Sequence, residues 1–135
     1  MNIKKIQSKE IVLAIIIKEG EWDKGLKFVS ADTDYQQVGF WNYEKGKVLQ
    51  AHVHLKASRE VLKTQEVIFM KQGSMRADIY DEDRVLVESL VLEKGDIGIF
   101  LNGGHGYEIL ENDTLVLEVK NGPYVGPEKD RERIS

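Results

Sequence analysis

Residues 46–73 have the sequence GKVLQAHVHLKASREVLKTQEVIFMKQG and contain two of the three histidines of the protein, His52 and His54, followed by Glu66. Side chains at positions i and i+2 of a β-strand point to the same face, so the two imidazoles can project into one cavity. The third histidine, His105, lies in a glycine-rich bend. Together with the Glu66 carboxylate, these imidazoles would form a four-ligand site for a divalent transition metal ion.

The two histidines are predicted to lie on a strand at residues 48–55, in which polar and apolar side chains alternate. The two faces of this strand would carry Val48, Gln50, His52 and His54 on one side and Leu49, Ala51, Val53 and Leu55 on the other. Because the histidines share the more polar face, a solvated or metal-lined interior suits this strand better than a dry core.

Short runs of β-branched, aromatic or alternating residues, separated by glycine- and aspartate-rich turns, predict strands along most of the chain. The other predicted strands cover residues 11–17, 26–30, 36–43, 61–71, 74–80, 85–92, 97–101, 107–110 and 114–120. Many short strands at regular spacing indicate an all-β barrel or sandwich. We expect one domain over residues 1–135, with the barrel at about 26–122 and a charged tail at 126–135 that is solvated or forms a short helix.

Composition and charge narrow the class of function. The chain has 135 residues, of which 41% are hydrophobic and 31% charged, and its formal net charge is −4. This balance is typical of a soluble globular protein, and the lack of a clustered basic stretch argues against a nucleic-acid partner. The chain has no cysteine, so any metal must be held by nitrogen and oxygen ligands.

The apolar run at residues 11–17 bears on the location of the protein. It has β-branched residues at five of seven positions and charged residues on both sides. The run is too short to span a membrane and lacks a small-residue cleavage site, so it predicts a strand that is covered on both faces or lies at a subunit contact. We therefore expect a cytoplasmic protein with no membrane partner.

The spacing of these residues resembles the first of two sequence motifs of the cupin family. That motif is a glycine, five residues, His-x-His, three or four residues, a glutamate, six residues and a glycine. Its positions are matched by Gly46, His52, His54, Glu66 and Gly73. The match departs from the family in one interval, because eleven residues separate the second histidine from the glutamate.

The second cupin motif is a glycine, five residues, Pro-x-Gly, two residues, a histidine, three residues and an asparagine. Gly95, Gly103 and His105 match it more loosely. Leu101 replaces the proline, the histidine comes one position early, and Ile109 stands where the asparagine would be. The two motifs and the residues between them cover most of the predicted barrel.

This resemblance implies a double-stranded β-helix, the jelly-roll barrel of the cupins, with His52, His54, Glu66 and His105 as metal ligands. The long interval leaves Glu60 as an alternative carboxylate, but the strand that follows Glu66 carries the rest of the motif and favours Glu66. Such a ligand set leaves coordination positions open, as in catalytic or ligand-binding metal sites. Imidazole and carboxylate ligands accept Fe, Mn, Zn, Ni or Co, so they do not name the ion.

The chain also resembles small stand-alone cupins that share the bend GGHGYE and the closing segment EVKNGPY. Such relatives are mostly described as metal-binding proteins, some of them associated with surface-polysaccharide biosynthesis, and cupins commonly form homodimers. The resemblance therefore implies a homodimeric metal-binding protein of carbohydrate metabolism that takes a small polar or sugar-derived ligand.

Three further residues are candidate catalytic groups. Tyr107 lies two positions after His105 and therefore on its face, and Glu118 and Lys120 share a face of the strand predicted at residues 114–120. These groups could transfer a proton while the metal polarises neighbouring substrate oxygens, as in an isomerase or epimerase. A packed tyrosine and an exposed ion pair are the structural alternatives. A non-catalytic metal- or carbohydrate-binding module and an iron-dependent dioxygenase are the functional ones.

Overall fold

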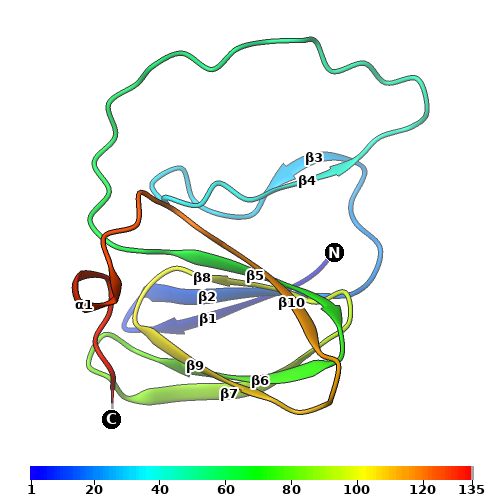
Figure 1. Cartoon of the computed structure of the whole chain (residues 1–135). Helices are drawn as coiled ribbons and strands as arrows, with labels where there is room; N and C mark the ends of the chain where they lie inside the picture. Colours follow the sequence, from blue (N-terminus) through cyan, green and yellow to red (C-terminus); the bar gives the residue numbers. More distant parts are fainter. Residues whose placement is uncertain (135) are drawn as a thin grey trace.

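The computed structural model describes residues 1–134 and shows two antiparallel β-sheets packed face to face, with a hairpin on the outer side of the larger sheet (Figure 1). The larger sheet has the strand order β1-β2-β8-β5-β10, the smaller one the order β7-β6-β9, and β3 and β4 form the hairpin. The elements are β1 Asn2–Ser8, β2 Ile11–Lys18, β3 Gly25–Phe28, β4 Gly39–Asn42, β5 Glu66–Gln72, β6 Ser74–Tyr80, β7 Leu86–Glu93, β8 Ile97–Phe100, β9 Gly104–Ile109, β10 Leu115–Lys120 and α1 Pro127–Asp130. The predicted all-β fold is confirmed.

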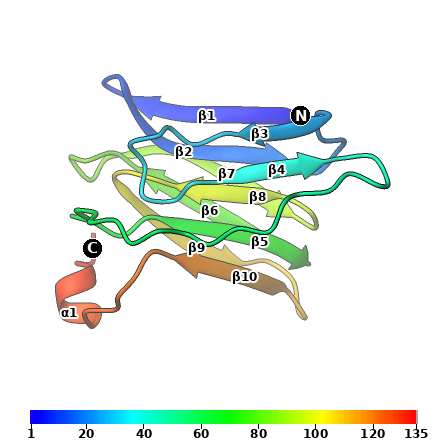
Figure 2. The same ribbon diagram turned by 90° about the horizontal axis from the view of Figure 1, so that it is seen from above.

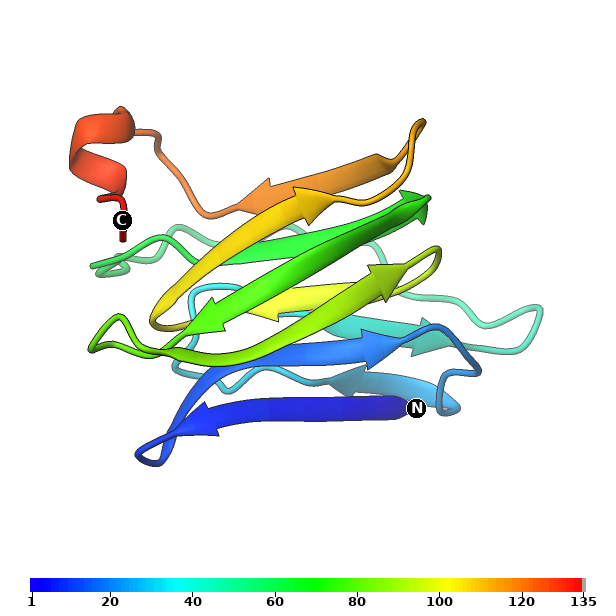
Figure 3. The same ribbon diagram turned by 90° about the horizontal axis from the view of Figure 1, so that it is seen from below.

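The main core lies between the two sheets, because the inner strands turn alternate apolar side chains toward the opposite sheet. These are Ile68 and Met70 in β5 and Met75, Ala77 and Ile79 in β6, all of them buried. Full burial of one large apolar side chain contributes about 1.5–3 kcal/mol, so this layer supplies much of the driving force for folding. Figure 3 shows the smaller sheet lying across the larger one, with gold β9 beside orange β10 at one side of the sandwich.

A second apolar cluster lies on the outer face of the larger sheet, beneath the β3–β4 hairpin (Figure 2). It joins Ile15 and Ile17 of β2 and Ile97 and Ile99 of β8 to Phe40 of β4. Strand β2 is therefore covered on both faces, which explains why it is apolar at nearly every position. The expectation of a doubly covered strand in this part of the chain is confirmed.

Residues 46–63, called the arm below, leave the sandwich and contain no strand, so the strand predicted for residues 48–55 is absent from this structure. Figure 1 shows this part of the chain arching away from the larger sheet between the β3–β4 hairpin and β5. Val53 is 81% exposed and Leu55 82%. A strand needs a neighbour for its backbone donors and acceptors, and among the described residues no strand runs beside the arm.

Three other parts of the chain differ from the prediction. The strand expected at residues 61–71 begins only at Glu66. The strand expected at residues 107–110 already begins at Gly104, so His105 lies on β9 and not in the bend before it. Strand β1 is not among the predicted strands, because Lys4 and Lys5 interrupt its apolar alternation. Lysines are common on strands at the edge of a sheet, which is where β1 lies.

Within residues 1–134, no helix is long and apolar enough to cross a membrane.

A buried carboxylate fixes the entry to β8. Asp96 is 1% exposed and accepts hydrogen bonds from the backbone N–H groups of Glu19 and Glu93, each at 2.7 Å. Its Oδ2 atom also lies 2.6 Å from the Nζ atom of Lys18 at the end of β2. A buried charge is tolerated only with such donors, so Asp96 holds the turn before β8 against the end of β2.

We predict that Asp96→Ala lowers the free energy of unfolding by about 3 kcal/mol, because it leaves two backbone N–H groups and one ammonium without their acceptor. Urea denaturation followed by circular dichroism measures this change. Asp83→Ala is the matched control, since Asp83 is 65% exposed and pairs with the exposed Lys9. If the two variants were equally stable, Asp96 would not have this structural role.

Candidate functional site

Three chemically active side chains meet at one end of the space between the two sheets. Glu66 is the first residue of β5 and, with Ile68, points into the sandwich. On β9, His105 lies opposite the buried Ile79 and Tyr107 opposite the buried Ala77, so both side chains also point inward. The strand alternation on two different sheets thus directs a carboxylate, an imidazole and a phenol toward one another.

The contacts among these three side chains are direct. The hydroxyl of Tyr107 donates a hydrogen bond of 2.6 Å to Oε1 of Glu66. The Nε2 atom of His105 lies 3.1 Å from the same oxygen. Glu66 is only 7% exposed, whereas the side chain of His105 is 31% exposed, so the imidazole forms the solvent side of the cluster. The ring of Phe100 packs against both aromatic partners, with centroids 5.0 Å from His105 and 5.5 Å from Tyr107.

The cluster changes the acid–base properties of two of its members. Burial by itself raises the pKa of the Glu66 carboxyl, but hydrogen bonds from His105 and Tyr107 and the nearby Lys120 outweigh burial, and the net pKa lies below its usual value. Burial and the neighbouring Glu66 charge raise the pKa of the Tyr107 hydroxyl far above its usual value. At neutral pH the structure therefore pairs an ionised carboxylate with a protonated phenol.

Strand β10 adds an ion pair beside this cluster. Lys120 lies opposite Glu66 in the antiparallel register of β10 and β5, and Glu118 lies opposite Ile68. The Nζ atom of Lys120 is 3.0 Å from Oε1 of Glu118, and this hydrogen bond raises the pKa of Lys120. Glu118 and Lys120 thus share a face of β10, as predicted, and it is the face that points into the sandwich. Both side chains are partly exposed.

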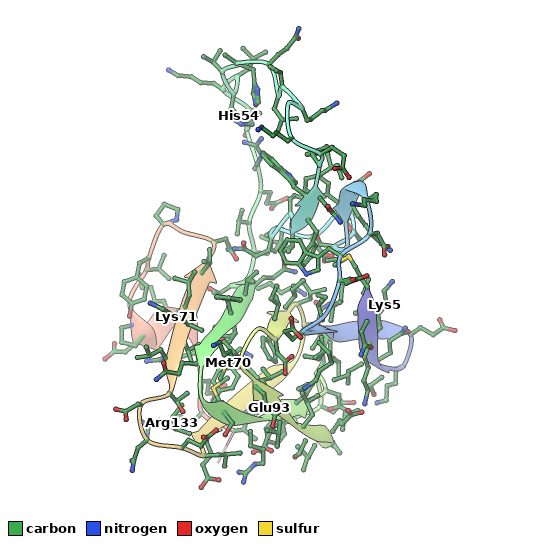
Figure 4. All side chains as sticks on the ribbon, turned by 90° about the vertical axis from the view of Figure 1, so that its right-hand side faces the viewer. Lys5, His54, Met70, Lys71, Glu93 and Arg133 are labelled. Carbon is green, nitrogen blue, oxygen red and sulfur yellow. The ribbon has the colours of Figure 1, made fainter. Side chains whose placement is uncertain are left out.

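The structure does not bring the other two predicted ligands to this cluster. His52 and His54 both lie on the arm, where their ring centroids are 5.1 Å apart and Nδ1 of His52 is 3.0 Å from the carbonyl oxygen of Gln50. Figure 4 shows His54 far out on the arm, well separated from Met70 in the sandwich. Within residues 1–134, no group of three or more His, Asp or Glu side chains lies close enough to hold a metal ion.

The two candidate carboxylates are separated in the same way. Glu66 contacts His105, whereas Glu60 lies on the exposed arm. The four predicted ligands therefore lie in two separate places. Glu66 and His105 are in contact in the sandwich, and His52 and His54 lie outside it on the arm.

A glycine places β9 correctly for this contact. Gly103 has φ +72°, and a Cβ atom there would lie 2.1 Å from the carbonyl oxygen of Tyr80 at the end of β6. Only glycine tolerates both the left-handed backbone and so close an approach. The bend therefore lets β9 begin directly beside β6, with His105 as its second residue.

The sequence analysis identifies His105, Glu66 and Tyr107 but misses Phe100. Phe100 is an apolar residue at the end of β8, and nothing in the sequence distinguishes it from the other apolar residues. Only its packing against the rings of His105 and Tyr107 shows that it belongs to the site.

The chain matches no family model, no curated protein and no solved structure. The function is therefore inferred from the chemistry of the side chains that line this site.

We predict that Tyr107→Phe lowers the free energy of unfolding by about 1.5–3 kcal/mol, the usual contribution of a hydrogen bond to a charged group. The same change removes a bond that favours ionised Glu66, so the pKa of the Glu66 carboxyl should rise. Denaturation and carboxyl ¹³C NMR titration measure the two effects. Tyr80→Phe is the control, because the Tyr80 hydroxyl has no hydrogen-bond partner within the described chain. Equal results for both variants would contradict the role of Tyr107.

Proposed function

We propose that the chain is a cupin-type metal-binding protein whose site for a small polar or sugar-derived ligand is built around Glu66 and His105. The observation that carries this proposal is the contact of 3.1 Å between a buried carboxylate and a partly exposed imidazole, directed inward from two different sheets. A divalent transition metal ion prefers such oxygen and nitrogen donors. The face-to-face antiparallel sheets support the proposal that the fold is a double-stranded β-helix.

The residues of the sandwich fit a metal ion in part. Glu66 and His105 would supply two ligands, and His52 and His54 are the residues proposed to complete the set. When bound, the ion would act as a Lewis acid toward hydroxyl or carbonyl oxygens of the ligand. Phe100 would hold the His105 ring in place through their aromatic contact, as a packing residue and not as a ligand.

The remaining side chains have roles that follow from their protonation. Tyr107 and Lys120 have raised pKa values and are hydrogen-bond donors at neutral pH, suited to stabilising negative charge on a ligand oxygen. Glu118 would be the proton acceptor among these side chains, once its ion pair with Lys120 is broken. This division of donors and acceptor is what an isomerase or epimerase of a sugar-derived substrate requires.

A non-catalytic metal- or carbohydrate-binding module is the second candidate, and one observation favours it. Each candidate acid–base group is already engaged: Tyr107 with Glu66, and Lys120 with Glu118. A site in which no group is free to take up a proton is suited to holding a ligand without transforming it. Turnover therefore separates the two candidates.

We predict that the protein, stripped with a chelator, binds added Mn²⁺, Fe²⁺ or Zn²⁺, and that His105→Ala and Glu66→Gln weaken this binding by at least about 10-fold. Isothermal titration calorimetry measures the affinity. Glu108→Gln is the matched control, because Glu108 follows Tyr107 on β9 and pairs with Arg76 at 2.6 Å, away from Glu66 and His105. Unchanged affinity in both site variants would refute the metal site.

We predict that Lys120→Met lowers turnover of a sugar-derived substrate by at least about 100-fold while substrate binding persists, because acid–base groups commonly contribute 10²–10⁴-fold. Incorporation of deuterium from D₂O, followed by NMR on a panel of sugars and sugar nucleotides, measures turnover. Lys71→Met, at an exposed position of β5, is the control. Ligand binding without turnover in the wild type would select the binding module, and oxygen uptake with Fe²⁺ would select a dioxygenase.

A further inference from the structure

Strand β9 forms one of the two edges of the smaller sheet, and β7 forms the other. Strand β9 pairs with β6 on one side, and on its other side it has no strand neighbour within the described chain. Ile109 of β9 and Val116 of β10 are 56% and 36% exposed along this open side of the sandwich. An unprotected edge with apolar side chains beside it is a surface on which a further strand can pair.

The arm has the complementary property, because it is an apolar segment that has no strand neighbour among the described residues. Val48, Val53, Leu55 and Leu62 are between 75% and 82% exposed. Within residues 48–55 the apolar residues alternate with Gln50, His52 and His54, which is the pattern of a strand with two different faces. So much exposed apolar side chain on one segment is unusual for a protein surface that remains uncovered.

The arm and the side of the sandwich formed by β9 and β10 also carry opposite net charges. The arm carries four cationic residues and one carboxylate, a net charge of +3. Residues 104–120, which form β9, β10 and their connection, carry four carboxylates and one lysine, a net charge of −3. Opposite charges of this kind steer association and fix which surfaces meet.

We infer that the arm of one molecule pairs as a strand with the free edge of β9 in a second copy of this chain, and that the exchange is reciprocal in a twofold dimer. A second copy is the occupant because the arm points away from its own β9: Figure 1 shows the arm above the larger sheet and β9 in the sheet on the opposite side. Exchange of an identical segment is a common route to a symmetric dimer.

The exposed outer face of β5 and β10 supports the same arrangement. The β3–β4 hairpin covers the outer side of β2 and β8, but Phe69, Leu115, Leu117 and Val119 remain 38–57% exposed. These four residues lie on adjacent strands, since Leu117 is opposite Phe69 and Val119 opposite Val67. A second copy whose arm crosses to β9 would also cover this apolar face.

The exchange has a consequence for the site, which rests on the proposed function. A strand beside β9 would carry His52 and His54 of the second copy to the edge where His105 and Glu66 of the first copy lie. Each complete ligand set would then come from two molecules, and a single chain would hold only part of it. This explains why the described chain has the ligands in two separate places.

The pairing itself is tested by mass and by amide exchange. Sedimentation of the wild type should give twice the chain mass of 15.4 kDa, and the amides of residues 48–55 should be protected from hydrogen exchange. The double variant Val53→Asp/Leu55→Asp should be a folded monomer with an unprotected arm. The double variant Val85→Asp/Leu86→Asp, at exposed apolar positions beside the opposite edge of the same sheet, should remain a dimer.

Metal binding by mixed dimers tests the shared site. One copy carries His52→Ala/His54→Ala and the other His105→Ala, and dimers that contain both are isolated with two different affinity tags. If the site is shared, one of the two sites in each mixed dimer has all of its ligands, so metal affinity returns to the wild-type value at that site. If each chain builds its own site, both sites are damaged and affinity is not restored.

Each outcome bears on the inference. A monomeric wild type, an unprotected arm, or a dimer that survives Val53→Asp/Leu55→Asp would overturn the strand exchange. A monomer with protected arm amides would show that the arm closes on its own β9, which also overturns it. A wild type that binds no metal but loses its dimer in the arm variant would refute the proposed function and support the exchange.

Discussion

Main-chain hydrogen bonding between neighbouring strands determines which segments of this chain belong to the sandwich. Every strand of the two large sheets lies beside at least one other, and the arm, which lies beside none among the described residues, stays outside. Apolar character does not explain this difference, because Val53 and Leu55 are as apolar as the buried Ile68. A segment can bury such side chains in a sheet only when its amides and carbonyls also find partners.

The same constraint shapes the candidate site. Glu66 lies at the beginning of β5, where the larger sheet meets the inner face of β9, and its carboxylate is buried together with apolar neighbours. The two donors that compensate for this burial come from the other sheet, as His105 and Tyr107. The cluster is therefore both a polar link between the sheets and the candidate functional site, and these two roles depend on the same atoms.

Much of the fold could be predicted from local pattern. The strands expected at residues 74–80, 85–92, 97–101 and 114–120 correspond closely to β6, β7, β8 and β10, because turn residues and apolar alternation depend on local sequence. The strand expected at residues 48–55 has the same alternation and does not form in this chain. Its pattern is suited to pairing, but pairing depends on a neighbour that no local pattern specifies.

In the candidate site, too, local pattern predicted some features, and others depend on the path of the whole chain. The i, i+2 spacing correctly places Tyr107 on the face of His105, and the residues that follow Glu66 favour it over Glu60 as the carboxylate near that histidine. The spacing also makes His52 and His54 neighbours, but it does not determine how far they lie from the sandwich. That distance depends on the path of the arm, which is a property of the whole chain.

The sequence by itself determined that this protein is built from short antiparallel strands and which side chains share a face of each strand, because both follow from a period of two residues along the backbone. Only the tertiary structure decided that Glu66, His105, Tyr107 and Phe100 meet, that Asp96 is buried, and that the arm stands apart from β9. Those features depend on register between strands and on how two sheets face each other, and these are set by contacts between residues far apart in the chain.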